Sequence, residues 1–261
     1  MKSWYLGTIG FSYKDWVGTF YPAGTTPRNY LSYYTKVFNS VEIDSSFHAI
    51  PRFENIISWV NTTPTDFKFC LKTPRRITHE LGLINADGLM EEFVDSIKPL
   101  GDRIGPILIQ LPPGFTQAYV SILEMFLEKL PRNYRYAIEF RHSSWYNEYT
   151  SRLLSLFGVS WVAIDFPHLP KTITPTTDFL YIRWIGKNGM FQHHSFERVD
   201  KSDHMRMWLD TVQSLDENFN EIYGFFNNDY AGFAAGSCIR FKRLAGFAVE
   251  EEEFPLQGRL F

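Results

Sequence analysis

The chain has 261 residues, of which 44% are hydrophobic, enough to bury one large core but too few for two full domains. Its 26 basic and 29 acidic residues give a net charge of −3, which excludes a global positive field that would draw it onto nucleic acid or an acidic membrane. The two cysteines lie in no metal-ligand or redox spacing, so no disulfide is predicted. No signal peptide or membrane-spanning run is recognised, and we predict a cytoplasmic protein with a single domain over residues 1–261.

Short β-rich segments alternate with longer segments whose apolar residues recur at helical spacing. This is the pattern of βα units around a parallel sheet. Residues 107–109, 161–164 and 179–182 are continuously apolar or aromatic, as expected of strands buried on both faces. The eight predicted strands are residues 4–9, 40–43, 67–71, 107–111, 136–140, 160–164, 179–183 and 222–226.

Helical periodicity fills most of the segments between these strands. The first helix is predicted after Thr26, taken as the N-cap, with Pro27 at the first helical position, and Gly158 is predicted to end the helix before the sixth strand. Residues 166–177 contain three prolines, so an irregular connection is predicted between strands six and seven. The other helices are predicted at 89–100, 122–130, 205–212 and 231–244, and the acidic run 250–253 is predicted to be solvated.

Eight strands with helical crossovers fit either a closed barrel or a doubly wound open sheet. The open sheet usually carries a glycine-rich fingerprint after its first strand. Here Gly7 and Gly10 are followed by Phe11-Ser12-Tyr13, which is not that fingerprint. The sequence therefore favours an α/β fold of the (β/α)8 TIM type.

Polar residues collect where the predicted strands end, the side of a parallel barrel that carries function. Charged groups buried there are costly unless paired, so a compensated network is expected. A purely structural plug of ion pairs is the alternative, but apolar residues usually serve stability better. We predict Glu42, Glu139, Asp165 and Lys72 as catalytic, and Arg75, Gln110, Arg141, Arg183 and Asn227 as ligand-binding.

Aromatic residues follow the same strand ends. Tyr13, Trp16 and Trp145 are predicted to offer flat faces to a ligand with a ring-like body, although packing of loops on the rim is the simpler interpretation for any one of them.

Metal and nucleotide motifs are absent from the sequence: there is no P-loop, no G-x-S-x-G elbow and no H-E-x-x-H. A divalent metal held by Glu42, Glu139 and Asp165 with His48, His79 or His142 stays open, but no tight ligand spacing supports it, and no metal residue is assigned. The adjacent pair His193-His194 lies in a loop, where neighbouring residues rarely bind one metal.

A set of short stretches distributed along the chain carries a family resemblance: 7–13 with Trp16, 20–22, 41–43 with Phe47, 67–69, 77–79, 110–115, 139–141 with 144–145, and 226–228. Together these stretches resemble the YecE-like family, a widespread group with a domain of unknown function. The resemblance implies a TIM-type barrel and brings no established reaction; nucleic-acid binding, by likeness to barrel endonucleases that act at damaged sites, is the function associated with it. Asp44, His48 and the exit 183–186 depart from the family pattern.

Three functions remain open from the sequence. In the first, the mouth binds a phosphate-containing ligand or nucleic acid through Lys72 and the arginines, and Glu42 or Glu139 positions a water or a metal for phosphodiester hydrolysis. In the second, Glu42 and Glu139 are the carboxylate pair of an acid/base enzyme on a carbohydrate, with Trp16 or Trp145 stacking the sugar. The third is a non-catalytic binding module.

Overall fold

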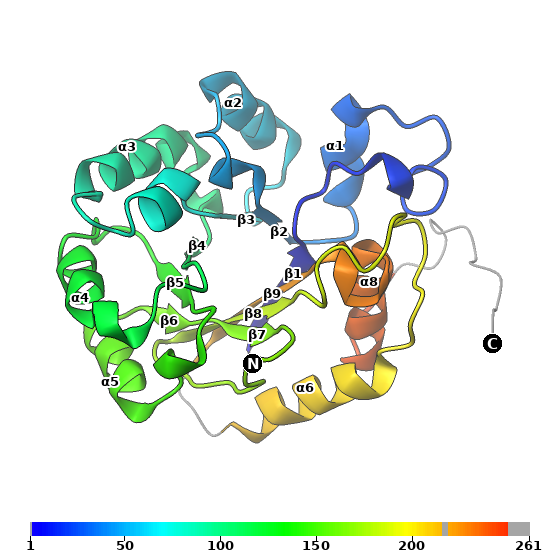
Figure 1. Cartoon of the computed structure of the whole chain (residues 1–261). Coiled ribbons are helices and arrows are strands. Elements are labelled where there is room, and N and C mark those ends of the chain that lie inside the picture. Colours follow the sequence, from blue (N-terminus) through cyan, green and yellow to red (C-terminus); the bar gives the residue numbers. More distant parts are fainter. Residues whose placement is uncertain (1, 216–218, 250–261) are drawn as a thin grey trace.

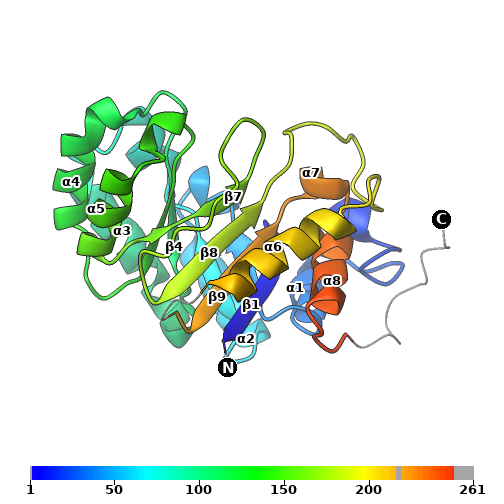
Figure 2. The same cartoon turned by 90° about the horizontal axis from the view of Figure 1, so that it is seen from below.

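Parallel strands lie at the centre of the molecule and helices lie around them (Figure 1). The computed structural model describes residues 2–215 and 219–249, so the acidic run 250–253 lies outside the described residues. Helix α8 packs on β1 and β9, and α6 packs on α8, which places both helices over one side of the strands (Figure 2).

The described elements alternate along the chain as the sequence predicts. The strands are β1 Ser3–Thr8, β2 Ser40–Ile43, β3 Lys68–Leu71, β4 Ile107–Gln110, β5 Tyr136–Glu139, β6 Ser160–Trp161, β7 Ala163–Asp165, β8 Phe179–Trp184 and β9 Glu221–Phe226. The helices are α1 Tyr30–Tyr34, α2 Phe53–Thr62, α3 Asp87–Ile97, α4 Val120–Glu128, α5 Glu148–Phe157, α6 Ser202–Ser214, α7 Asn228–Ala231 and α8 Ala234–Leu244.

The strands pair in parallel and form three sheets. Their orders are β1-β9-β8-β7, β2-β3 and β4-β5-β6. Single parallel bridges, Ile9 to Glu42 and Lys72 to Leu108, lie between the ends of neighbouring sheets. The parallel α/β architecture is therefore confirmed, while the hydrogen bonds of the strands form three sheets rather than one continuous ring.

Register decides which side chains share a face, because partners in neighbouring parallel strands point the same way. Glu42 is level with Cys70, Gln110 with Glu139, and Ile164 with Arg183. These side chains share their face with a buried cluster that contains Ile9, Cys70, Leu108, Ala137, Ile164, Tyr181, Tyr223 and Phe225. The polar network thus sits on top of an apolar plug.

Several elements differ from the prediction. The sixth strand is interrupted at Val162, which donates its N–H to Ile138 and splits the segment into β6 and β7. The predicted last helix breaks at Gly232, whose φ of 100° ends α7 before α8 begins. Helix α2 was not predicted, although Phe53, Ile56, Ile57 and Val60 recur at helical spacing; of its ten residues only Ile56 is buried.

Helix ends partly follow the prediction. Thr26 stands at the N-cap of a 3₁₀ turn that Pro27 opens ahead of α1, as predicted, but the Thr26 hydroxyl makes no capping hydrogen bond. Gly158 ends α5 in the left-handed conformation, with a φ of 64°, as predicted.

The connection between β7 and β8 is irregular, as its prolines predict. Both cysteines are free and buried. Among the described residues, no helix combines the length and the apolar character needed to cross a membrane. The cytoplasmic location stays a prediction.

Candidate functional site

A pocket of about 350 Å³ lies at the C-terminal ends of the strands. Eight of the strands contribute a residue at or just after their ends, which is why the pocket gathers positions far apart in the sequence. The residues that line it are Ile9, Asp44, Lys72, Gln110, Pro113, Arg141, Phe166, Arg183, Ile185, Asn188 and Asn227.

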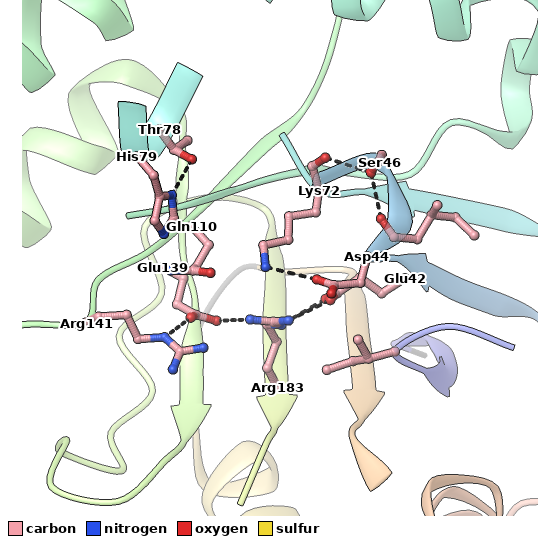
Figure 3. Close-up of polar contacts among 12 residues, drawn as sticks. Glu42, Asp44, Ser46, Lys72, Thr78, His79, Gln110, Glu139, Arg141 and Arg183 are labelled. Carbon is pink, nitrogen blue, oxygen red and sulfur yellow. Dashed lines mark hydrogen bonds and ion pairs between the residues drawn. The ribbon is translucent and has the colours of Figure 1, made fainter. Parts of the chain in front are cut away.

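The floor of the pocket is a buried guanidinium between two buried carboxylates (Figure 3). Arg183 donates from Nε and Nη2 to Glu42, at 2.9 and 2.7 Å, and from Nη1 to Glu139. Tyr181, two residues earlier on the same face of β8, donates its hydroxyl to Glu42 at 2.8 Å. Every nitrogen of Arg183 is occupied, so this residue holds the two carboxylates in place.

The two carboxylates differ in their tendency to ionise. Burial alone would raise the pKa of Glu139, but Arg141 and Arg183 outweigh it and lower that pKa to about 2. Burial raises the pKa of Glu42, although Arg183 opposes the shift. Glu139 is therefore a fixed anion at neutral pH, and Glu42 is the member of the pair that protonates first.

Arg141 follows β5 and shares Glu139 with Arg183. Its Nε contacts the Glu139 carboxylate, and its guanidinium lies 4.3 Å from the ring centroid of Phe166. The two terminal nitrogens of Arg141 contact no acceptor among residues 2–215 and 219–249. Because Arg141 also lines the pocket, these two nitrogens are available as donors to a ligand there.

Lys72 follows β3 on the other side of Arg183. Its ammonium lies 2.9 Å from Asp44 Oδ1 and 4.0 Å from the ring centroid of Phe47. The Lys72 side chain is 9% exposed, whereas that of Asp44 is 41% exposed. With all six groups ionised, three acids (Glu42, Asp44, Glu139) and three bases (Lys72, Arg141, Arg183) give a net charge of 3 − 3 = 0.

Neutral amides complete the lining. Gln110, at the end of β4, donates from Nε2 to the Leu111 carbonyl at 2.8 Å. Asn227, after β9, accepts at Oδ1 from the Asp229 N–H at 2.8 Å and so begins α7. Seven of the twelve predicted site residues thus meet here: Glu42, Lys72, Gln110, Glu139, Arg141, Arg183 and Asn227.

Asp165 does not join them. It is level with Trp184, one position after the inward-facing pair Ile164 and Arg183, and therefore points toward the surrounding helices. Its carboxylate contacts Lys171 at 3.0 Å, His204 at 3.0 Å and Trp208 Nε1 at 3.2 Å. Successive side chains of a strand point to opposite faces, and the prediction of Asp165 from its place at a strand end did not take this alternation into account.

The predicted aromatic platform is also wrong. Trp16 and Trp145 are fully buried and donate from Nε1 to Asn228 and to the Phe115 carbonyl. Tyr13 donates its hydroxyl to the Ile9 carbonyl at 2.6 Å and packs on Trp16. Packing of loops onto the strand ends is the role that the structure gives these rings. Arg75 is exposed, pairs with Glu80 at 3.7 Å and does not line the pocket.

The histidines do not assemble a metal site. His79 contacts Thr78 through Nδ1, His142 accepts from the Ser144 N–H, and His194 donates its backbone N–H to Asp15. Among the residues that the structure describes, no group of three or more His, Cys, Asp or Glu side chains is arranged to hold a metal ion.

Sequence reasoning missed Phe166 and Asn188. Phe166 directly follows β7, a signal that the strand-end rule offered. Asn188 reaches the pocket because Gly186, with a φ of 74°, lets the chain cross α7 closely: a Cβ on Gly186 would lie 2.2 Å from the Asp229 carbonyl oxygen.

The model of the family described as "Protein of unknown function DUF72" matches residues 5–258. The chain belongs to the DUF72 family. The UPF0759 protein YecE of Escherichia coli K12 is 30% identical to it, over 75% of this chain and 78% of the relative. The UPF0759 protein YunF of Bacillus subtilis is 25% identical, over 88% and 90%. The resemblance to YecE-like proteins is thereby confirmed.

Solved DUF72 structures share the fold of this DUF72 chain. A DUF72 family protein from Thermotoga maritima, solved at 2.20 Å resolution, superposes with a TM-score of 0.80 at 33% identity, covering 94% of this chain and 99% of the other. One from Enterococcus faecalis, at 20% identity, gives a TM-score of 0.76 over 95% and 97%.

Proposed function

We propose that the pocket binds a small ligand through a phosphate group, held by Arg141 and Lys72. The guanidinium of Arg141 carries the proposal, because Arg141 lines the pocket, Glu139 fixes its Nε, and neither terminal nitrogen has an acceptor among the described residues. Two adjacent N–H donors of one guanidinium match two oxygens of a phosphate. The Lys72 ammonium, with one N–H on Asp44 and others to spare, adds a second cation.

We also infer that the three sheets close into a single-domain (β/α)8 barrel of the TIM type. With β6 and β7 counted as one interrupted strand, the nine described strands give eight. The two bridges between sheets and the apolar cluster that the strands surround support closure. The pocket then lies at the mouth where barrel proteins of this type bind ligands.

Binding is better supported than catalysis. A hydrolase needs a group that takes a proton from water beside the substrate. Glu139, with its pKa lowered to about 2, is a weak base, Glu42 is occupied by Arg183 and Tyr181, and neither lines the pocket. Their roles are to position Arg183 and Arg141. The same burial counts against a carboxylate pair acting on a carbohydrate, and a binding module without turnover fits the geometry.

The first experiment is calorimetric titration of the protein with inorganic phosphate at two salt concentrations. We expect saturable binding that weakens as salt rises, because the contacts are charged. Arg141→Met, which keeps the length of the stem and removes the donors, should lower phosphate affinity about 10-fold or more, since a charge-assisted hydrogen bond contributes ~1.5–3 kcal/mol. Lys72→Met should weaken binding in the same direction.

Arg75→Met is the matched control, because Arg75 is an exposed arginine outside the pocket. It should leave phosphate affinity unchanged. Thermal unfolding of each variant separates lost binding from lost structure. Absence of binding in the unmodified protein, or equal affinities for the folded Arg141 and Arg75 variants, would contradict the proposal.

A further inference from the structure

Acceptors accompany the cations in the pocket. Asp44 uses Oδ1 for Lys72, and its Oδ2 has no hydrogen-bond partner among residues 2–215 and 219–249. Gln110 is oriented by the bond from its Nε2 to Leu111, which leaves its carbonyl oxygen as an acceptor at the pocket wall. Figure 3 shows Lys72 and Asp44 on one side of Arg183, with Gln110 and Arg141 on the other. A ligand spanning this space meets donors and acceptors together.

The charge balance limits how many anionic groups the ligand carries. The six charged groups cancel, so the pocket has no surplus of cations for a chain of phosphates. Arg141 and Lys72 can hold one phosphate, whereas a second phosphate near Asp44 would meet a carboxylate. Hydroxyl groups, which donate hydrogen bonds to carboxylate and amide oxygens, suit that part of the pocket.

The two phenylalanine rings beside the pocket each have a cationic side chain on one face. Phe47 lies against the Lys72 ammonium, and Phe166 lies against the Arg141 guanidinium. Trp16 and Trp145, the large rings predicted to offer flat faces to a ring-like ligand, are fully buried. Apart from Phe166, one face of which Arg141 covers, a nucleobase would meet no aromatic ring in the pocket lining, whereas single-stranded nucleic acids usually bind on several such rings.

We infer that the ligand is a phosphorylated polyol of about the size of a pentose phosphate, with its phosphate on Arg141 and Lys72 and its hydroxyls on Asp44 and Gln110. This inference rests on the proposed phosphate binding and adds the chemistry of the rest of the ligand. The volume of about 350 Å³ lies at the small end of the range of ligand pockets, which agrees with a compact molecule.

The test compares three probes by calorimetry: inorganic phosphate, ribose 5-phosphate and free ribose. In the unmodified protein, ribose 5-phosphate should bind at least about 10-fold more tightly than inorganic phosphate. A site whose acceptors, here Asp44 and Gln110, are placed to bind hydroxyl groups strongly favours a ligand that has them over one that lacks them. Free ribose should bind far more weakly than either. Asp44→Ala should bring the affinities for ribose 5-phosphate and phosphate close together. It should leave phosphate affinity equal or higher, because a negative charge beside Lys72 is removed.

The matched control is Glu80→Ala, which removes the exposed carboxylate paired with Arg75 outside the pocket. It should preserve the preference for ribose 5-phosphate. Gln110→Met is the second pocket variant and should reduce the preference without removing phosphate binding. A merely destabilised protein would instead lose affinity for both probes together.

The outcomes distinguish this inference from the proposed function. If neither phosphate nor ribose 5-phosphate binds, the phosphate site itself is wrong. If phosphate binds and ribose 5-phosphate binds no more tightly, or Asp44→Ala keeps the full preference, the polyol is wrong and the phosphate site stands. Tighter binding of a single-stranded oligonucleotide than of ribose 5-phosphate would overturn the polyol in favour of nucleic acid.

Discussion

Arg141 and Arg183 look equivalent in the sequence but have different roles in the structure. Arg183 is 3% exposed and donates from all three of its side-chain nitrogens to Glu42 and Glu139, whereas Arg141 donates from one nitrogen to Glu139. Removing one partner of a buried ion pair leaves an uncompensated charge, which costs more than the pair contributes. Glu139 is the residue whose loss leaves both arginines short of an acceptor.

Glu139→Gln keeps the size of the side chain and removes its charge. At pH 7 we expect the free energy of unfolding to fall by about 3–5 kcal/mol, the usual result of breaking a buried pair. Urea unfolding measures the change. Glu148→Gln, at an exposed glutamate that pairs with Arg152, is the control and should change stability little.

The pH dependence of this difference has a definite sign. Glu139 has a folded-state pKa of about 2, below its ordinary value of 4.5. Its stabilising contribution is therefore complete above pH 4.5 and is lost as pH falls from 4.5 toward 2. The gap between the unmodified protein and Glu139→Gln should narrow between pH 4.5 and pH 3. A gap that stays constant over that interval would show that Glu139 does not titrate as an ion-paired carboxylate.

At the scale of elements, the β7–β8 connection joins two polar clusters. Its first residue, Phe166, packs on Arg141 of the pocket, and Lys171 reaches Asp165 and His204. Nε2 of His204 lies 3.2 Å from the Lys171 ammonium, while Nδ1 lies 3.0 Å from Asp165 and 3.2 Å from the Tyr230 hydroxyl. Helix α6 therefore anchors the segment that supports Arg141.

This anchor should weaken in mild acid. Burial lowers the pKa of His204, and Lys171 and Lys201 lower it further against the opposing effect of Asp165. Below pH 6.5 the unfolded chain takes up a proton that the folded protein resists, so stability falls with pH through that range. In urea unfolding, the stability lost between pH 7 and pH 5 should be smaller for His204→Asn than for the unmodified protein. His168→Asn, at an exposed histidine of the same connection, should lose as much as the unmodified protein, and equal losses in all three proteins would contradict the anchor.

Element positions followed from sequence where burial is strong. Strands β4 and β8 are buried at every residue, and continuous apolar runs identify them. Helix α2 was not predicted although its apolar residues recur at helical spacing, whereas the split of the last helix depends on the backbone angle of Gly232. Periodicity reports the apolar face of an element, so a local break in the backbone leaves little trace in it.

At the scale of the molecule, the sequence predicted which residues lie at the strand ends but not which face each one takes. Asp165 is the last residue of β7 and Arg183 is the last but one of β8, and this difference of one position directs Asp165 toward α6 and Arg183 into the pocket. The face that the last side chain of a strand takes depends on the residue at which strand pairing stops. Tertiary contacts determine that residue. Whether the terminal N–H groups of Arg141 are available to a ligand likewise depends on the position of its partner Glu139, which the residue type alone does not reveal.

The pairing of the first and last strands makes a prediction for the whole fold. β1 pairs with β9 along its full length, from Ser3 with Glu221 to Thr8 with Phe226, so the two ends of the described chain support one another. If the sheets close into one barrel, no strand can leave without opening the ring, and unfolding should be a single cooperative transition. Urea unfolding followed by far-ultraviolet circular dichroism and by tryptophan fluorescence should give coincident curves. Trp4, Trp59, Trp145 and Trp208 report from different parts of the fold, so two separated transitions would show that the sheets unfold independently and that the barrel is not one unit.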